Sequence, residues 1–236
     1  MFFFDPMWFL IMLPPFIFMI YAQVKVNSAF KKYSKVANSQ RITGVQAAEV
    51  LLRANGLKNV RVEGVKGRLG DHYDPRKKVL RLSPAVANTP SVAALGIVAH
   101  EVGHAVQDKT GYAFLRFRTS LVPAASLGSN LGFIFVILGF IIYLFSRDSD
   151  FAPMVVLAGI ILFAMAVIFS LVTLPVEYNA SNRARQMLRS TGMVSTQEYN
   201  GASAVLSAAA LTYVAAMLQA VAQLFYFVLM FMGMRR

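Results

Sequence analysis

The sequence predicts an α+β membrane protein in which four transmembrane helices accompany a small sheet-bearing domain. Three observations indicate this class. Hydrophobic residues make up 57% of the chain and charged residues only 14%, against roughly 25% charged residues in a typical soluble domain. Four stretches are apolar and uncharged over lengths that approach or match a bilayer core. The long region between the first two stretches holds most of the charge and alternates short helix and strand patterns.

The predicted membrane spans are these four stretches, residues 7–21, 126–145, 151–175 and 204–234. The first is short, and Pro14 and Pro15 are expected to kink it. We interpret it as an anchor rather than a cleaved signal peptide. No Lys or Arg precedes it, and no small-residue cleavage site follows before Lys25.

The charge distribution predicts how the chain is oriented. Residues 25–118 carry 17 Lys and Arg against 6 acids, which gives +11 of the net +12. The positive-inside rule therefore places 25–118 and 177–201 in the cytoplasm and the loop 146–150 outside. Arg235 and Arg236 then end the chain on the outer side, against the rule. We expect the basic region to face anionic lipid rather than nucleic acid, because no nucleic-acid motif is present.

Five segments follow from this topology. They are a first transmembrane helix at 1–24, a cytoplasmic domain at 25–118, a hairpin of the second and third helices at 119–176, a polar segment at 177–203 and a fourth helix at 204–236. The cytoplasmic segment is small for a domain, so we expect it to pack onto the membrane helices. The absence of cysteine excludes a disulfide framework and any Cys-based metal site.

Local patterns predict the elements of residues 25–118. A helix is expected over 44–55, because Thr43 and Gln46 form a capping-box pattern and Gly56 can end it. Strands are expected where residues alternate, at 59–65 and 78–82. Ser83-Pro84 and Thr89-Pro90 each resemble a helix start, and the second pair opens a helix over 90–107. Residues 28–38 are either a continuation of the first helix or a linker.

The string His100-Glu101-Val102-Gly103-His104 lies inside the predicted 90–107 helix and is an HExxH pattern. Residues four apart share one face of a helix, so both imidazoles can reach one metal ion. Glu101 can then act as general base toward water activated by zinc. An accidental match would bury two histidines and a glutamate without a metal, which is costly. The pattern therefore indicates a zinc site.

Catalytic zinc usually has three protein ligands, and Glu177 is the candidate for the third. It directly follows the third span, and the hairpin formed by the second and third spans returns the chain to the side carrying His100 and His104. The alternative is a solvated interfacial glutamate paired with Arg183 or Arg185. We favour the ligand, because an acid at the mouth of a transmembrane helix needs a function.

These motifs resemble those of the integral-membrane gluzincin metallopeptidases. HExxH and a glutamate separated by a transmembrane hairpin are similar to the HtpX-type and CAAX-prenyl-protease-type peptidases. The strings DHYDP at 71–75, HEVGHAVQ at 100–107, VEYNAS at 176–181 and AAALTYVAA at 208–216 resemble the bacterial YugP-type neutral zinc metallopeptidases more closely. The resemblance covers nearly the whole chain. It implies a zincin-like domain, one Zn²⁺ held by His100, His104 and Glu177, and Glu101 as general base.

One position departs from the HtpX-type pattern, which places an Asp four residues after the glutamate ligand to support a metal-binding histidine. Ser181 stands there, and Asn179 is a second candidate for that role. Candidates for stabilising the oxyanion of peptide hydrolysis are His72, Arg183, Tyr199 and Tyr213. His72 is expected in the turn between the two strands and is equally a structural turn residue. Tyr213 is better explained as an interface anchor, and Arg183 as a partner for lipid phosphate or an acid.

The strand 78–82 has two interpretations, an edge strand that pairs with extended substrate or an ordinary sheet strand. The favoured function is a membrane-embedded zinc endopeptidase of the plasma membrane, which the resemblance implies is bacterial. It would open toward the cytoplasm and cleave membrane or membrane-proximal polypeptides. The alternative is a catalytically silent protease-like scaffold that regulates a membrane partner. A zinc transporter is disfavoured, because no predicted span carries an ionisable residue in its interior. An oligomer or a gating partner is compatible with either function.

Overall fold

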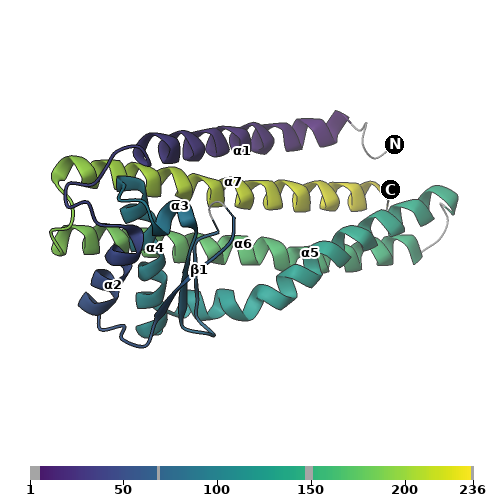
Figure 1. Cartoon of the computed structure of the whole chain (residues 1–236). Helices are drawn as coiled ribbons and strands as arrows, with labels where there is room; N and C mark the ends of the chain where they lie inside the picture. The colour runs from purple at the N-terminus through teal and green to yellow at the C-terminus, as the bar shows by residue number, and fades with distance from the viewer. Residues whose placement is uncertain (1–5, 68–69, 147–150, 235–236) are drawn as a thin grey trace. The chain divides into compact units, whose positions relative to one another are not determined.

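The computed structural model describes residues 6–67, 70–146 and 151–234. Within these ranges the chain forms helices and a small sheet (Figure 1), in agreement with the predicted α+β class. The elements in chain order are α1 Pro6–Tyr33, α2 Gly44–Ala54, β1 Arg61–Gly64, β2 His72–Asp74, β3 Val79–Leu82, α3 Pro84–Ala87, α4 Val92–Lys109, α5 Ala113–Phe145, α6 Phe151–Ser190 and α7 Thr196–Met234.

Two compact units divide the chain. The first, here called the membrane unit, comprises residues 1–21, 117–174 and 213–236. The second, here called the site unit, comprises residues 22–116 and 175–212. The long helices α1, α5, α6 and α7 each contribute residues to both units.

The four predicted spans are confirmed as helices. Among the described residues, α1, α5, α6 and α7 are long and apolar enough to cross a bilayer. Helix α1 continues through Pro14 and Pro15 to Tyr33, so the first part of 28–38 extends the helix. The loop 147–150 and the terminal Arg235 and Arg236, which entered the topology prediction, lie outside the described residues.

Close backbone approach holds α5 against α6 in the membrane unit. A β-carbon added at Gly132 would lie 2.7 Å from the backbone nitrogen of Phe163, and one at Gly159 would lie 2.7 Å from the backbone oxygen of Gly132. Small residues allow such contact between membrane helices, where packing replaces the hydrophobic driving force. Phe227 of α7 is fully buried beside this pair and stacks edge-on against Phe163.

The site unit contains a three-stranded sheet in the order β1-β3-β2. Strand β1 pairs in parallel with β3, and β2 pairs antiparallel with β3. The predicted strands at 59–65 and 78–82 are confirmed as β1 and β3, but β2 was expected to be a turn. Its three residues are too few for alternation to reveal, and Gly70 and Pro75 beside them favoured the turn. The edge-strand hypothesis for 78–82 is wrong, because β3 is paired on both sides.

Side-chain caps set the starts of the helices in this unit. The predicted capping box is present on α2: Thr43 accepts a hydrogen bond from the Gln46 backbone, and the Gln46 side chain accepts one from the Thr43 backbone. Gly56 follows α2 with a φ of 63°, the left-handed conformation expected after a helix end. Helix α4 begins later than predicted. Its N-cap is Ser91, whose hydroxyl accepts a hydrogen bond from the Ala94 backbone, and the cap is not Thr89.

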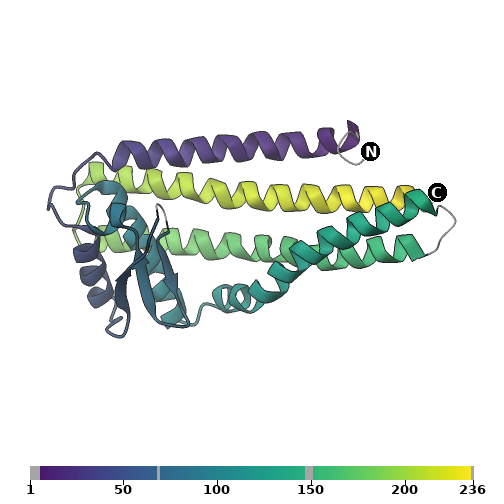
Figure 2. The same ribbon diagram turned by 45° about the vertical axis from the view of Figure 1, so that its right-hand side comes forward.

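One hydrophobic core joins α2, the sheet and α4 to the parts of α6 and α7 that belong to the site unit. Figure 2 shows the strands side by side near α4, and α4 contacts β2 and β3 directly. Leu188 of α6 and Leu206 of α7 are buried in this core together with Leu95 and Val98 of α4. Residues 25–118 therefore do not close their core alone, as predicted, and α4 is buried against α6.

Candidate metal centre

Helix α4 presents the two histidines of the HExxH pattern on one face. Their ring centroids are 4.8 Å apart, and the rings are nearly perpendicular. His104 is 8% exposed and His100 is partly buried. The Nε2 atoms of both imidazoles point toward one carboxylate oxygen, which belongs to Glu177.

Glu177 lies on α6 and is 2% exposed. Its Oε2 atom is 3.1 Å from His100 Nε2 and 3.5 Å from His104 Nε2. The alternative interpretation of Glu177 as a solvated interfacial glutamate is therefore wrong, because the side chain is buried. The two arginines donate hydrogen bonds to other residues, Arg183 to Asn179 and Arg185 to Asn182 and Ser207.

This geometry is compatible with a metal ion. One ligand atom from each of His100, His104 and Glu177 can be chosen so that all lie within 4.8 Å of one another. Tetrahedral zinc with bonds of about 2.1 Å separates its ligand atoms by about 3.4 Å. The two distances from Glu177 fall on either side of that value. Two imidazoles and one carboxylate are also a donor set typical of catalytic zinc.

A glycine allows α4 and α6 to approach closely at this point. A β-carbon at Gly103 would lie 2.6 Å from the backbone oxygen of Ala180. Gly103 directly precedes His104, and Ala180 lies three residues after Glu177. The close contact between the two backbones therefore sets the distance from the histidines to the glutamate.

Gly103→Ala should separate the helices. We expect a loss of about 1–3 kcal/mol in stability, as for other overpacked cores, and weaker zinc binding. Gly96→Ala is a matched control on the same helix, because its β-carbon would meet Ala202 at an ordinary 3.4 Å. Thermal unfolding in detergent and zinc titration would measure both effects. Equal behaviour of the two variants would contradict this explanation.

Glu101 lies beside the three candidate ligands and is 9% exposed. Its Oε2 atom accepts a hydrogen bond of 3.0 Å from the backbone N–H of Tyr73, in β2. Oε1 accepts no hydrogen bond from the described residues. Burial raises the pKa of the Glu101 carboxyl; the nearby Glu177 carboxylate acts in the same direction, and the two imidazoles oppose it. A raised pKa makes this carboxylate a stronger proton acceptor.

Each histidine is oriented by a hydrogen bond at its other nitrogen. The Nδ1 atom of His100 is 3.2 Å from the hydroxyl of Ser181, the residue that stands where the HtpX-type pattern has Asp. The Nδ1 atom of His104 is 3.0 Å from Oε1 of Gln107. Both contacts leave Nε2 directed at Glu177, the orientation that a metal ligand requires.

Gln107 was not identified from the sequence, although its amide connects both helices of the site. It is fully buried, accepts from His104 and donates from Nε2 to the backbone oxygen of Val176 at 2.8 Å and to Asn179 Oδ1 at 3.0 Å. Both N–H donors of the Gln107 amide nitrogen therefore have an acceptor. The available signal was its position, one turn after His104 on the same helix face. Asn179 thus supports Gln107 and not a histidine directly.

Gln107→Leu should weaken zinc binding by about 10–100-fold, the usual effect of losing a group that orients a metal-binding histidine. Gln46→Leu removes a glutamine of the same unit from the α2 capping box and serves as control. Competition with a zinc chelator would measure both affinities. A Gln107→Leu affinity no weaker than that of the control would contradict the orienting role.

The remaining candidates contact other groups. His72 is exposed in β2, and its ring nitrogens contact the Gly70 backbone oxygen and Arg81. Arg183 donates to Asn179, and Tyr199 lies beneath the guanidinium of Arg189. Tyr213 belongs to the membrane unit, on α7. These contacts of His72, Arg183 and Tyr199 do not reach the candidate ligands. The oxyanion stabiliser stays a prediction.

Apolar helices long enough to cross a bilayer, together with a histidine pair and a buried glutamate, are the features expected of an integral-membrane metal-dependent peptidase. Residues 8–232 match the family described as "Putative neutral zinc metallopeptidase", so the chain belongs to this family. It is 43% identical over 215 residues to "Putative membrane protease YugP" of Bacillus subtilis (strain 168), covering 91% of this chain and 92% of that protein. No solved structure matches the chain.

Proposed function

We propose that this chain is a membrane-embedded zinc endopeptidase that hydrolyses membrane or membrane-proximal polypeptides. One zinc ion would be held by His100, His104 and Glu177, with Glu101 as general base. The observation that carries the proposal is the convergence of three ligand atoms within 4.8 Å of one another, beside Glu101, which lies on the same helix as the two histidines. Family membership and the related membrane protease support it independently.

The chemistry divides between the metal and the protein. Zinc, when bound, lowers the pKa of water to about 7 and polarises the substrate carbonyl. Glu101 accepts the proton from water through Oε1, the oxygen that receives no hydrogen bond from the described residues, and delivers it to the leaving amine. Ser181 and Gln107 hold the imidazoles in place throughout, and the buried position of Glu177 keeps bulk water from its carboxylate.

The length of α6 supports a site near the membrane surface. The helix begins at Phe151, and Glu177 is 26 residues further along, or about 39 Å at 1.5 Å per residue. The hydrocarbon core is about 30 Å thick. If the helix crosses the bilayer near its start, Glu177 lies beyond the apolar region, where segments of membrane-anchored substrates emerge.

Removal and return of zinc test the proposed activity. The detergent-purified protein should cleave an unfolded polypeptide, lose this activity in 1,10-phenanthroline, and regain it when zinc is restored. Identification of new internal N-termini would establish endopeptidase activity. A zinc-loaded, folded protein that cleaves neither unfolded nor membrane-anchored substrates would favour the scaffold alternative.

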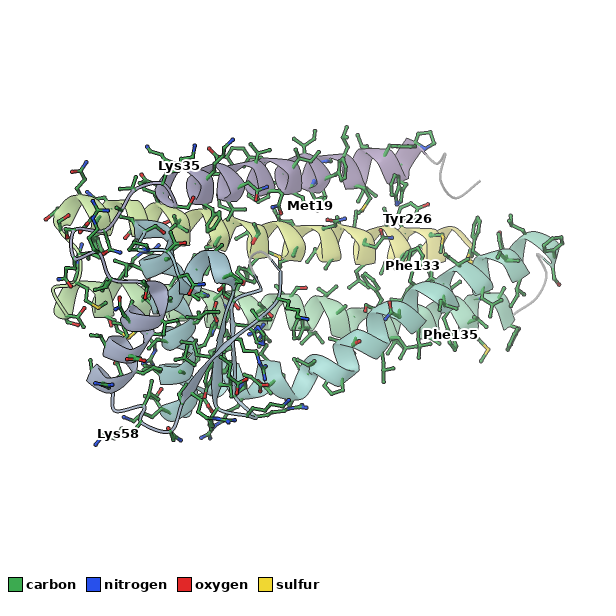
Figure 3. The ribbon with its side chains drawn as sticks, viewed as in Figure 1. Met19, Lys35, Lys58, Phe133, Phe135 and Tyr226 are labelled. Atoms are coloured by element: carbon green, nitrogen blue, oxygen red, sulfur yellow. The ribbon has the colours of Figure 1, made fainter. Side chains whose placement is uncertain are left out.

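We propose that the site lies on the cytoplasmic side of a bacterial plasma membrane. The excess of Lys and Arg in residues 25–118 supports this orientation. The cysteine-free chain allows a direct test. Lys58 is exposed in the site unit, where its side chain points away from the ribbon (Figure 3), and Ser146 is exposed after α5.

In intact cells, a membrane-impermeant maleimide should label Ser146→Cys, and it should label Lys58→Cys only after permeabilisation. A permeant maleimide should label both variants under either condition, which controls for reactivity. The reverse pattern with the impermeant reagent would contradict the orientation.

A further inference from the structure

Tyr73 contacts α4 at two points along the same helix face. Its backbone N–H donates to Glu101 Oε2 at 3.0 Å, and its hydroxyl donates to Asp108 Oδ2 at 2.7 Å. Glu101 and Asp108 are seven residues apart, close to two turns of helix, or about 10.5 Å along the axis. The tyrosine therefore lies lengthwise on α4, with its backbone at the proposed general base and its hydroxyl at the helix end.

Lys78 connects the contact between Tyr73 and Asp108 to the sheet. Lys78, which directly precedes β3, forms an ion pair with the same Oδ2 atom of Asp108. The Asp108 side chain is 21% exposed, so this pair is partly shielded from solvent. Because β3 pairs with β2, the contacts form a closed loop through Tyr73, Asp108, Lys78 and the strands.

The tyrosine belongs to the buried core of the site unit and also borders a cavity. Tyr73, Lys78 and Asp108 all line a cavity of about 250 Å³, bordered also by Ala105 of α4 and Leu57. Beside this space the ring is packed on only part of its surface. The hydrogen bond to Asp108 then determines where the ring lies, and through the ring it determines where the Tyr73 backbone meets Glu101.

We infer that Tyr73 is a positioning residue for Glu101 and that Asp108, held by Lys78, fixes Tyr73 in place. The inference rests on the proposed function of Glu101 as general base. With Oε2 held by the Tyr73 N–H, the carboxylate presents Oε1 to water in one orientation. When the anchor at Asp108 is lost, β2 can shift along α4, and Glu101 samples orientations in which proton transfer is slow. The candidate metal ligands are not part of this network.

Tyr73→Phe removes the donor of the anchor, and Asp108→Asn removes the carboxylate charge that pairs with Lys78 and strengthens the hydrogen bond from the Tyr73 hydroxyl. Both variants should lower kcat about tenfold, while KM and zinc content remain close to wild type. A loss of orientation of a proton-transfer group acts on the chemical step. The double variant should be no worse than the more severe single one, because both changes act on one connection. Lys78→Arg should retain most of the activity, since it keeps the charge.

Asp74→Asn is the matched control. Asp74 is on the same short strand, but its carboxylate accepts from the Arg76 and Lys77 backbones and from Arg81, and not from α4. The same acid-to-amide change there should leave kcat unchanged. Wild-type kcat in folded, zinc-loaded Tyr73→Phe and Asp108→Asn would overturn the inference, as would fully additive effects in the double variant.

A second measurement does not depend on turnover. The Tyr73 amide should exchange its hydrogen faster in Asp108→Asn than in wild type, and Asp74→Asn should not change it. Residue-resolved hydrogen exchange would show this difference even if no substrate is cleaved. Absence of cleavage by wild type would count against the proposed function, whereas equal exchange in wild type and Asp108→Asn would overturn the inference itself.

Discussion

Glu101→Gln should eliminate cleavage while leaving zinc binding intact. The glutamine amide has nearly the same shape as the carboxylate, and its oxygen can still accept the Tyr73 backbone hydrogen bond. It cannot accept a proton from water at neutral pH. Loss of a general base usually costs about 10²–10⁴-fold in rate, so we expect activity near or below the detection limit of a peptide assay.

The measurement is kcat/KM beside metal content in the same preparations. Glu49→Gln is a suitable control, because Glu49 is an exposed glutamate of α2 that pairs only weakly with Arg53 at 3.8 Å. The control should match wild type in both quantities. If Glu101→Gln binds one zinc and retains activity, Glu101 is not the base, and another group takes the proton.

Residues that act through local sequence could be predicted. The HExxH histidines are four apart on a helix, so their common face follows from helix geometry alone. Thr43 and Gln46 cap α2 through contacts three residues apart. Glu177 required one further step, the return of the chain through a membrane hairpin, and the structure brings it to the histidines.

Residues that act through tertiary contacts could not be predicted in the same way. Gln107 orients His104 only because α6 supplies Val176 and Asn179 as acceptors for its amide. The Tyr73 contact to Glu101 uses a backbone N–H, which every residue except proline possesses, so no side-chain pattern reveals it. Strand β2 exists because β3 offers an unpaired edge, and three residues leave no periodic pattern.

The sequence offers two possible start positions for α4. Thr89-Pro90 and Ser91 are both acceptable helix starts by residue type. The isolated pairing of Ala37 with Ser91 keeps the chain extended up to Ser91, and the Ser91 hydroxyl then caps the Ala94 backbone. A contact from residues more than fifty positions earlier therefore decides a local boundary.

Glu177→Gln should abolish activity for a different reason, the loss of zinc. The amide is neutral, and its oxygen is a poorer ligand than a carboxylate, so zinc affinity should fall at least as far as the 10–100-fold typical of losing a mere supporting residue. The variant should be purified largely without metal, in contrast to Glu101→Gln. Metal analysis and chelator competition would measure the difference, with Glu49→Gln again as control.

The stability of the same variant separates two roles of Glu177. A structural ion pair with protonated His100 and His104 would make Glu177→Gln destabilising in metal-free protein, since removing one partner leaves a buried charge uncompensated. A metal ligand instead makes the variant lose the stabilisation that zinc adds to wild type, which follows RT ln(1 + [Zn]/Kd). We therefore expect wild type to gain thermal stability with added zinc and Glu177→Gln to gain little. An equal zinc-dependent gain in both proteins would remove Glu177 from the coordination sphere, and the third ligand would then have to be sought among the other acids near α4.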